Sequence, residues 1–191
     1  MRTDRWQWDE KHAAGVPELA GPPLAYLVAW TPLLPKGRAL DLAAGCGRHA
    51  VFLAQRGYRV DALDISHVGL TRLIRQADAR GLSVRAAVVD LDDLMLPWAT
   101  YDLIVNTYYL NRPLLAQLPR ALVPGGALLV ETRLYDPARD RPDAIARRAG
   151  PGELARVFSD LDIAHYEETP AAPPHRTRGL CRMVAFRPIR A

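Results

Sequence analysis

The sequence feature that most restricts the possible folds is a glycine-containing turn in ALDLAAGCGRHA (residues 39–50). It lies between an apolar segment and a helical segment. Gly45, Gly47 and Ala50 fit G-x-G-x-x-A, the pattern typical of a turn that joins a strand to a helix and binds a dinucleotide. An acidic residue, Asp41, stands four positions ahead of the first glycine. The turn predicts an α/β fold, and Asp41 bears on which ligand the turn accepts.

Strand-like and helix-like segments alternate from residue 37 onward. We expect strands over 38–44, 58–65, 84–90, 101–107 and 127–133, and helices over 48–57, 66–81 and 111–126, the last broken at Pro119. Ser66 is a plausible N-cap and Gly81 a C-terminal stop. Alternation of this kind favours a mainly parallel sheet with helices on both faces, and the apolar strand segments agree with it.

The C-terminal part follows a different order. A helical segment over 150–161 precedes two strand-like segments, 162–168 and 179–188, joined by residues 169–178. Two successive strands indicate an antiparallel pair at the sheet edge. The expected fold is therefore a Rossmann-like three-layer sandwich whose mainly parallel, seven-stranded sheet has an antiparallel C-terminal strand pair. The loop 135–150 is long enough to be a lid or to be poorly ordered.

The N-terminal part contains a stretch without charged residues over 19–35, close to the length of a membrane span. Its four prolines would break a spanning helix, so we interpret it as a core-packing helix with its loop. The preceding residues carry both charge signs, unlike a signal peptide. We expect residues 1–36 to be an N-terminal helical cap region of the same domain that residues 37–191 form.

Composition argues against several function classes. The net charge is +4, but the arginines are scattered, whereas a nucleic-acid-binding face would cluster them. The two cysteines and the histidines lack the spacing of a disulfide framework or a metal site, so we expect no metal and a cytoplasmic protein without a membrane segment.

The position of Asp41 discriminates between two ligands. A dinucleotide places its pyrophosphate at the turn, where a carboxylate would repel it. S-adenosylmethionine carries a sulfonium and an ammonium group instead, which a carboxylate attracts. Asp64, at the end of the second strand, suits the ribose hydroxyls, and Asp90, at the end of the third, suits an adenine amino group. Taken singly, the three acids could equally be a helix cap, a turn residue and a solvated strand end.

Several blocks, in order, resemble class I S-adenosylmethionine-dependent methyltransferases: ALDLAAGCGRHA, VDALDIS, VVDLDDL, YDLIVNTYYLNRPLL and LVPGGALLVET. The resemblance covers about residues 37–134 and implies that residues 37–191 form a class I methyltransferase domain. RWQWDEKH, YYLNRPLL and GPGELARVF further resemble small bacterial methyltransferases grouped with tellurite-resistance enzymes.

The resemblance implies a cofactor site for S-adenosylmethionine. Its residues are Asp41, Ala43, Gly45, Gly47, Asp64, Ile65, Asp90, Leu91 and Asn106. Asp90 and Leu91 would meet the adenine, and Asn106 would lie below the sulfonium. Trp6 and Trp8 match aromatic residues that cover the cofactor in relatives, with core packing as the alternative. His12 stands where relatives often have a tyrosine.

We predict that the methyl acceptor binds at the ends of the fourth and fifth strands. Methyl transfer requires alignment of two reactants, and a base only when the nucleophile is protonated. We expect Asn106, Tyr108, Tyr109 and Arg133 to line this region. Arg112 and Arg133 together would suit an anion, with an ordinary surface role as the alternative. We expect His49 on a helix surface.

The predicted function is methyl transfer to a small-molecule acceptor, such as a thiol, a chalcogen oxyanion or another small anion. One alternative is a module that binds the cofactor without transfer. Another is a nucleic-acid methyltransferase, although NTYY lacks both prolines of the Asn-Pro-Pro-Tyr loop of such enzymes. A nicotinamide-dependent dehydrogenase is disfavoured by Asp41. The oligomeric state is left open.

Overall fold

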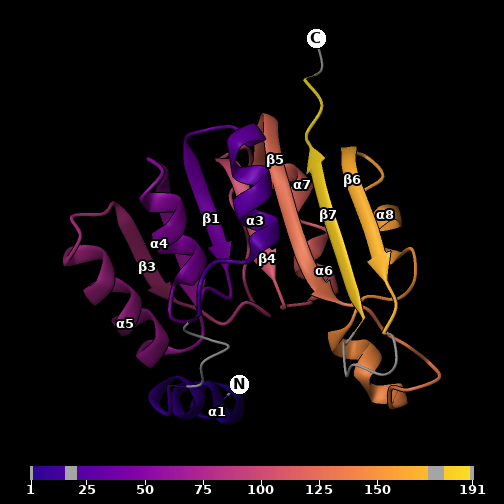
Figure 1. Cartoon of the computed structure of the whole chain (residues 1–191), viewed down its shortest axis with the longest axis horizontal. Coiled ribbons are helices and arrows are strands. Elements are labelled where there is room, and N and C mark those ends of the chain that lie inside the picture. The colour runs from indigo at the N-terminus through magenta and orange to yellow at the C-terminus, as the bar shows by residue number, and fades with distance from the viewer. Residues whose placement is uncertain (1, 16–20, 172–178, 190–191) are drawn as a thin grey trace.

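A computed structural model describes residues 2–15, 21–171 and 179–189. Its centre is a seven-stranded sheet in the order β3-β2-β1-β4-β5-β7-β6 (Figure 1). The strands are β1 (Arg38–Leu42), β2 (Arg59–Asp64), β3 (Val84–Val88), β4 (Tyr101–Thr107), β5 (Leu122–Arg133), β6 (Asp162–Thr169) and β7 (Leu180–Phe186).

The sheet is mainly parallel, as the sequence predicts. Pairs among β1 to β5 are parallel, whereas β7 runs antiparallel to both β5 and β6. The predicted Rossmann-like fold with an antiparallel C-terminal pair is confirmed. Because parallel strands share one direction, the carboxyl ends of β1 to β5 meet at a single edge of the sheet, the lower edge in Figure 1.

Helices cover both faces of the sheet. They are α1 (Arg2–Ala13), α3 (Ala25–Trp30), α4 (Arg48–Ala54), α5 (His67–Asp78), α6 (Arg112–Leu115), α7 (Leu118–Ala121) and α8 (Glu153–Val157), with short 3-10 helices η1 (Thr31–Leu33) and η2 (Pro142–Arg147). One buried cluster joins the sheet to α3, α4 and α5, and a second joins it to α6, α7 and α8. The three layers arise because buried parallel strands present apolar side chains to both sides.

The uncharged N-terminal stretch packs on the sheet, as expected, over its described part, 21–35. Leu27 and Leu34 are buried in the cluster with α4 and α5, and the Thr31 hydroxyl donates to the Leu27 carbonyl at 2.5 Å. Within the described ranges, no helix combines the length and the apolar character needed to cross a membrane.

The prediction for residues 111–133 is wrong in its boundaries. The helix is interrupted at residues 116–117, ahead of Pro119, and ends at Ala121 instead of at the glycine pair. Strand β5 already begins at Leu122, which pairs with Tyr101 of β4. A Cβ on Gly126 would lie 3.0 Å from the Tyr101 carbonyl oxygen, so this glycine permits close strand pairing and does not stop a helix.

The segment after β5 is folded back on itself. Tyr135 donates its backbone N–H to Ala149 at 2.8 Å, and Ala149 donates to Arg133 at 2.8 Å, which closes the loop at its base. The Arg112 guanidinium donates to Glu153 at 2.6 Å and to the Ile145 carbonyl at 3.1 Å. The loop therefore rests at the carboxyl-end edge of the sheet, beside β5 and β6 (Figure 1).

Candidate functional site

The glycine turn connects β1 to α4 through three residues with left-handed backbone. Ala43 has φ 54°, Gly45 φ 54° and Gly47 φ 80°. A Cβ on Gly47 would lie 2.2 Å from Cδ1 of Leu73, so only glycine fits between the turn and α5. Ala43 adopts the same region with the smallest possible side chain, at a cost of ~1–2 kcal/mol. The turn thus brings its backbone close to the sheet edge, as ligand-binding turns require.

Asp64 holds this turn to the end of β2. One carboxylate oxygen accepts the Gly45 N–H at 2.8 Å and the other accepts the Ser66 N–H at 2.7 Å. Burial raises the pKa of Asp64, while these two backbone hydrogen bonds act in the opposite direction. A carboxylate has about four acceptor positions, so both oxygens keep capacity for ribose hydroxyls.

Asp90 lies just beyond β3. The strand ends at Val88, two residues earlier than expected, and one Asp90 carboxylate oxygen caps the backbone N–H of Asp92 at 3.1 Å. The backbone N–H of Val89 donates to the Asp64 carbonyl at 2.9 Å, which joins this loop to the end of β2. Leu91 is buried beside it. The predicted ribose and adenine residues therefore come from neighbouring loops.

Asp41 is fully buried below the turn, on the α4 side of the sheet. Burial raises the pKa of this carboxyl to about 7, and the Ala50 N–H opposes the shift without completing a hydrogen bond of ordinary geometry. His49 lies 4.0 Å away, but burial lowers its pKa to about 3, so the contact is not an ion pair at neutral pH. The expectation of a surface position for His49 is wrong, because the first turn of α4 faces the sheet, where its ring meets Thr107 at 3.3 Å.

Unpaired buried groups lie at one edge of the sheet, on both of its faces. In the described residues, every buried side-chain nitrogen or oxygen without a hydrogen-bond partner belongs to one of four residues: Asp41, His49, Asn106 and Thr132. They lie on β1, β4, β5 and the first turn of α4, at the carboxyl-end edge of the sheet. Buried polar groups are nearly always paired, so this concentration indicates a ligand site.

Helix α1 packs against the other side of the turn. His12 is buried, with its Nδ1 3.2 Å from the Ser66 hydroxyl and its ring filling the space above Gly45 and Gly69. Asp9 accepts hydrogen bonds from the Ser66 hydroxyl at 2.6 Å and the Val68 N–H at 3.1 Å. Figure 1 shows α1 below α5, at the same sheet edge as the turn.

The two tryptophans of α1 remain accessible. Trp6 is 63% exposed and Trp8 is 39% exposed, with the Lys11 ammonium 4.3 Å from the Trp8 ring. Packing of these rings into the core, the alternative considered for them, is therefore wrong.

The residues predicted for the acceptor side separate into two groups. Tyr108 turns toward β5 and donates its hydroxyl to Glu131, and the Arg133 guanidinium lies 5.0 Å from its ring. Tyr109 turns the other way and donates to Asp92 at 2.8 Å, beside the loop of Asp90. The two tyrosines thus border different parts of the edge.

Arg112 does not join Arg133. Its guanidinium is bound to Glu153 in the loop beside α8, so the predicted pair of arginines facing one anion is wrong. A long side chain whose donors already meet a carboxylate and two carbonyls has little left for a ligand.

Sequence reasoning missed Glu131 and Asp9. Glu131 is 1% exposed and accepts from Tyr108 and, at 2.8 Å, from Arg182. A signal was present, because Glu131 is an acid inside the apolar strand segment ALLVETR. No local signal marked Asp9, because its partner Ser66 lies 57 residues away in the sequence.

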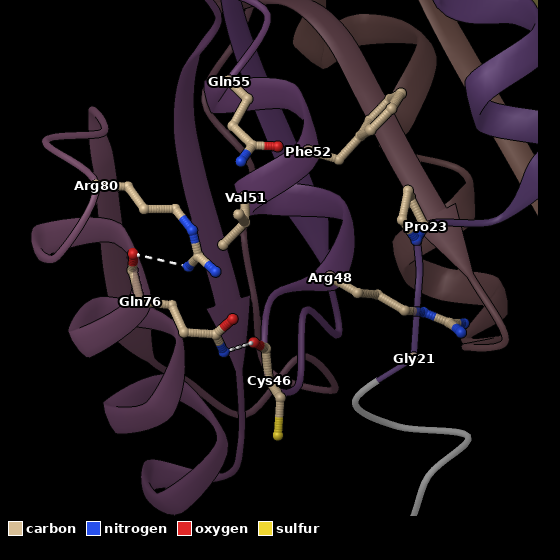
Figure 2. Close-up of a pocket in the computed structure, with 9 residues that line it drawn as sticks. All are labelled: Gly21, Pro23, Cys46, Arg48, Val51, Phe52, Gln55, Gln76 and Arg80. Atoms are coloured by element: carbon tan, nitrogen blue, oxygen red, sulfur yellow. Dashed lines mark hydrogen bonds between the residues drawn. The ribbon is translucent and has the colours of Figure 1, made fainter.

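One cavity lies near the unpaired buried groups, but none of these groups lines it. It measures about 220 Å³ between α4 and α5, and Figure 2 shows Arg48 extending toward Pro23 while Gln76 and Arg80 lie on the α5 side. It touches the turn only through Cys46 and Arg48. We place the site at the strand ends instead, because the unpaired buried groups lie there.

Comparison with known proteins agrees with this geometry. Residues 39–126 match the sequence model of a family described as a methyltransferase domain. No curated protein matches the chain in sequence. The match indicates a methyltransferase domain over these residues, which are 88 of the 191 in the chain.

Among solved structures, the chain is similar to TehB from Haemophilus influenzae, with a TM-score of 0.75 and 19% identity over 86% of this chain. It spans 62% of that protein's length. A geranyl diphosphate C-methyltransferase from Streptomyces coelicolor, in complex with S-adenosyl-L-homocysteine, gives 0.69 and 15%, covering 85% of this chain and 77% of that one. The [4+2]-cyclase SpnF gives 0.69 and 19%, covering 86% and 79%. At these identities the likeness concerns the fold.

The residues present fit S-adenosylmethionine. The turn offers close backbone approach, Asp64 and Asp90 offer acceptors, and the buried Asp41 places a titratable carboxyl beneath the turn. Asn106, which pairs with Leu42 across β1 and β4, adds an unpaired amide at the same sheet edge. In the part of the chain that the structure describes, no group of three or more metal-ligating side chains comes together.

Proposed function

We propose that this protein transfers the methyl group of S-adenosylmethionine to a small-molecule acceptor. The observation that carries the proposal is the set of unpaired buried groups at the carboxyl ends of β1, β4 and β5, the edge of the sheet that also carries the glycine turn. The cofactor supplies an electrophilic methyl group on a sulfonium sulfur. The protein's own part is to align the acceptor and to exclude water, which in well-oriented cases lowers the barrier by ~7–11 kcal/mol.

Within this proposal, Asp41, Ala43, Gly45, Gly47, Asp64, Ile65, Asp90, Leu91 and Asn106 bind the cofactor. The acceptor lies above the ends of β4 and β5, bordered by Asn106, Tyr108, Tyr109 and Arg133. Tyrosine offers a flat apolar wall with a polar tip, and arginine offers paired donors to an anionic group. Cys46 and Cys181 are both free thiols, which suits the reducing cytoplasm that we propose as the compartment.

Calorimetry tests the cofactor. We expect S-adenosylhomocysteine and S-adenosylmethionine to bind more tightly than NAD, because Asp41 disfavours a pyrophosphate at the turn. Tighter binding of NAD would contradict the assignment.

A second measurement tests the transfer. We expect formation of S-adenosylhomocysteine from S-adenosylmethionine in the presence of at least one member of a panel of thiols and metalloid oxyanions. One of the similar structures is that of a [4+2]-cyclase, so this fold also occurs in a protein named for another reaction. The rival to methyl transfer is a module that binds the cofactor without transferring its methyl group. Binding of S-adenosylhomocysteine with no methylation across the panel would favour that rival.

A further inference from the structure

The carboxylate of Glu131 is buried and has almost no direct contact with solvent. Glu131 lies in β5 between Val130 and Thr132, and only 1% of it is exposed. One carboxylate oxygen accepts the Tyr108 hydroxyl, and the other accepts Nε of Arg182 at 2.8 Å. A proton can therefore pass between Glu131 and the sheet edge only through the side chains that are hydrogen-bonded to it.

Tyr108 is bound to the same residue at both ends. Its backbone N–H donates to the Glu131 carbonyl at 2.8 Å, and its hydroxyl donates to the Glu131 carboxylate. Its φ of 57° lies in the left-handed region, which bulky residues rarely adopt. Strained residues of this kind persist where the surrounding structure holds them, and they concentrate at functional sites.

The direction of the hydrogen bond between Tyr108 and Glu131 determines whether the phenol oxygen can accept a further hydrogen bond. An ionised carboxylate only accepts, so Tyr108 must donate its proton to Glu131, and the phenol oxygen keeps its lone pairs for another donor. Tyr108 is 39% exposed, so this residue stands between the buried carboxylate and the accessible edge of the sheet. A partly exposed tyrosine hydrogen-bonded to a buried acid has the layout of a proton-transfer path.

We propose that Tyr108 and Glu131 form a proton relay that removes the proton from a thiol or hydroxyl acceptor during methyl transfer. This rests on the proposed function and narrows its substrate class to protonated nucleophiles. The acceptor's proton passes to the Tyr108 oxygen as the Tyr108 proton passes to Glu131. The nucleophile forms its bond to the methyl carbon, the electron pair of the broken carbon–sulfur bond stays on sulfur, and the relay later returns its proton to water.

The surrounding charges are compatible with this path. Burial, followed by the hydrogen bond to Glu131, raises the pKa of Tyr108 to about 12, so the phenol keeps its proton until it passes the proton on. Arg133 and Arg48 face Tyr108, while Arg182 and Tyr26 face Glu131, and Glu167 lies on the far side of Arg182. The arginines stay charged and burial raises the pKa of Tyr26, so none of these four changes its charge near neutral pH.

The test uses 2-mercaptoethanol as acceptor and Tyr108→Phe as the main variant. General base catalysis contributes ~10²–10⁴-fold, so turnover at neutral pH should fall at least tenfold, with affinity for S-adenosylhomocysteine changed less than twofold. The deficit should shrink as the pH rises through the ionisation of the thiol, because a thiolate needs no base. A deficit that is equal at every pH, or no deficit, would overturn the relay.

Tyr166→Phe is the matched control. Tyr166 also donates its hydroxyl to a glutamate, Glu168, but it packs on the opposite face of the sheet from Arg182, against the cluster with α8. It should retain wild-type turnover and the wild-type pH profile. An equal loss in this variant would mean that any broken tyrosine–glutamate pair impairs the protein.

A measurement without turnover separates the relay from the proposed function. Tyrosinate absorbance at pH 10.5 should be equal in wild type and Tyr108→Phe, whereas Glu131→Gln should ionise more tyrosine than Glu131→Gln with Tyr108→Phe. If Glu131→Gln does not fold because Arg182 loses its acid, the first comparison stands alone. Extra tyrosinate in wild type would overturn the pairing. A wild type that methylates metalloid oxyanions but no thiol or hydroxyl would overturn the relay and leave the proposed function standing. A wild type with the pairing intact that methylates no member of the panel would instead contradict the proposed function.

Discussion

Asp64 accepts a hydrogen bond from the backbone N–H of Gly45 at 2.8 Å, across 19 residues of chain. The carboxylate that the sequence assigns to the ribose is thus also the group that holds the glycine turn against β2. If Asp64 binds the ribose as proposed, cofactor binding and turn geometry are coupled through one side chain.

Replacing Asp64 should weaken the binding of the cofactor product. Hydrogen bonds to a charged group contribute ~1.5–3 kcal/mol each, so Asp64→Ala should raise the Kd for S-adenosylhomocysteine at least tenfold in calorimetry. Asp78→Ala, at the exposed end of α5, is the control and should bind as wild type does. An unchanged Kd in folded Asp64→Ala would mean that Asp64 only supports the turn.

Binding of S-adenosylmethionine should depend on pH through Asp41. Its pKa is raised to about 7 by burial, and a nearby cation favours the ionised form. Affinity should therefore be lost as the pH falls below about 7, and binding near neutral pH should release protons. His49, whose pKa is lowered to about 3, stays neutral throughout this range.

The ligand itself provides the control for that prediction. S-adenosylhomocysteine lacks the sulfonium charge, so its affinity should vary less with pH, and Asp41→Asn should remove the difference between the two ligands. Calorimetry in buffers of different ionisation enthalpy measures the proton release. Equal pH dependence for both ligands would show that Asp41 does not respond to the sulfonium.

A pair of glycine substitutions should separate backbone strain from steric clash. Gly57 has φ 85° and open space around a built Cβ, whereas Gly47 has φ 80° and Leu73 only 2.2 Å away. Gly57→Ala should lower the free energy of unfolding by ~1–2 kcal/mol, the cost of the left-handed region. Gly47→Ala should cost more, as measured by urea denaturation. In a Leu73→Ala background, the excess cost of Gly47→Ala should largely disappear.

We expect Arg133 to contribute to turnover of the acceptor and not to the affinity for the cofactor. If the acceptor is a small anion or carries an anionic group, Arg133→Met should reduce turnover while the Kd for S-adenosylhomocysteine stays nearly constant. Arg59→Met, an exposed arginine at the amino end of β2, is the matched control. Parallel loss of turnover and cofactor affinity would place Arg133 in support of the cofactor site or the fold, and loss of neither would make it a surface arginine.

Local patterns were sufficient for the fold and for naming much of the proposed cofactor site. Each buried strand is an apolar segment of its own, and the N-cap at Ser66, whose hydroxyl accepts from Gly69, follows from residue type and spacing. Asp41 and Asp64 could be named because strand ends are readable along the chain, and parallel strands bring their carboxyl ends to one edge.

Other boundaries depended on neighbouring strands. The glycines at 125 and 126 resemble a helix stop, but pairing with β4 draws residues from Leu122 onward into β5. His49 follows a turn and looks solvent-facing, yet the first turn of α4 directs it onto the sheet beside Asp41. Tertiary contact outweighed local preference in both places.

The contacts on the acceptor side were decided by tertiary structure alone. Tyr108 meets Glu131 because β4 and β5 pair with Thr107 opposite Glu131, a register that no local pattern specifies. Arg112 meets Glu153 across 41 residues and so leaves Arg133 without the partner expected for it. The sequence by itself determined which residue types stand at the strand ends. Only the packing of strands and loops decided which of those side chains bind one another, because partner choice depends on distances between segments far apart in the chain.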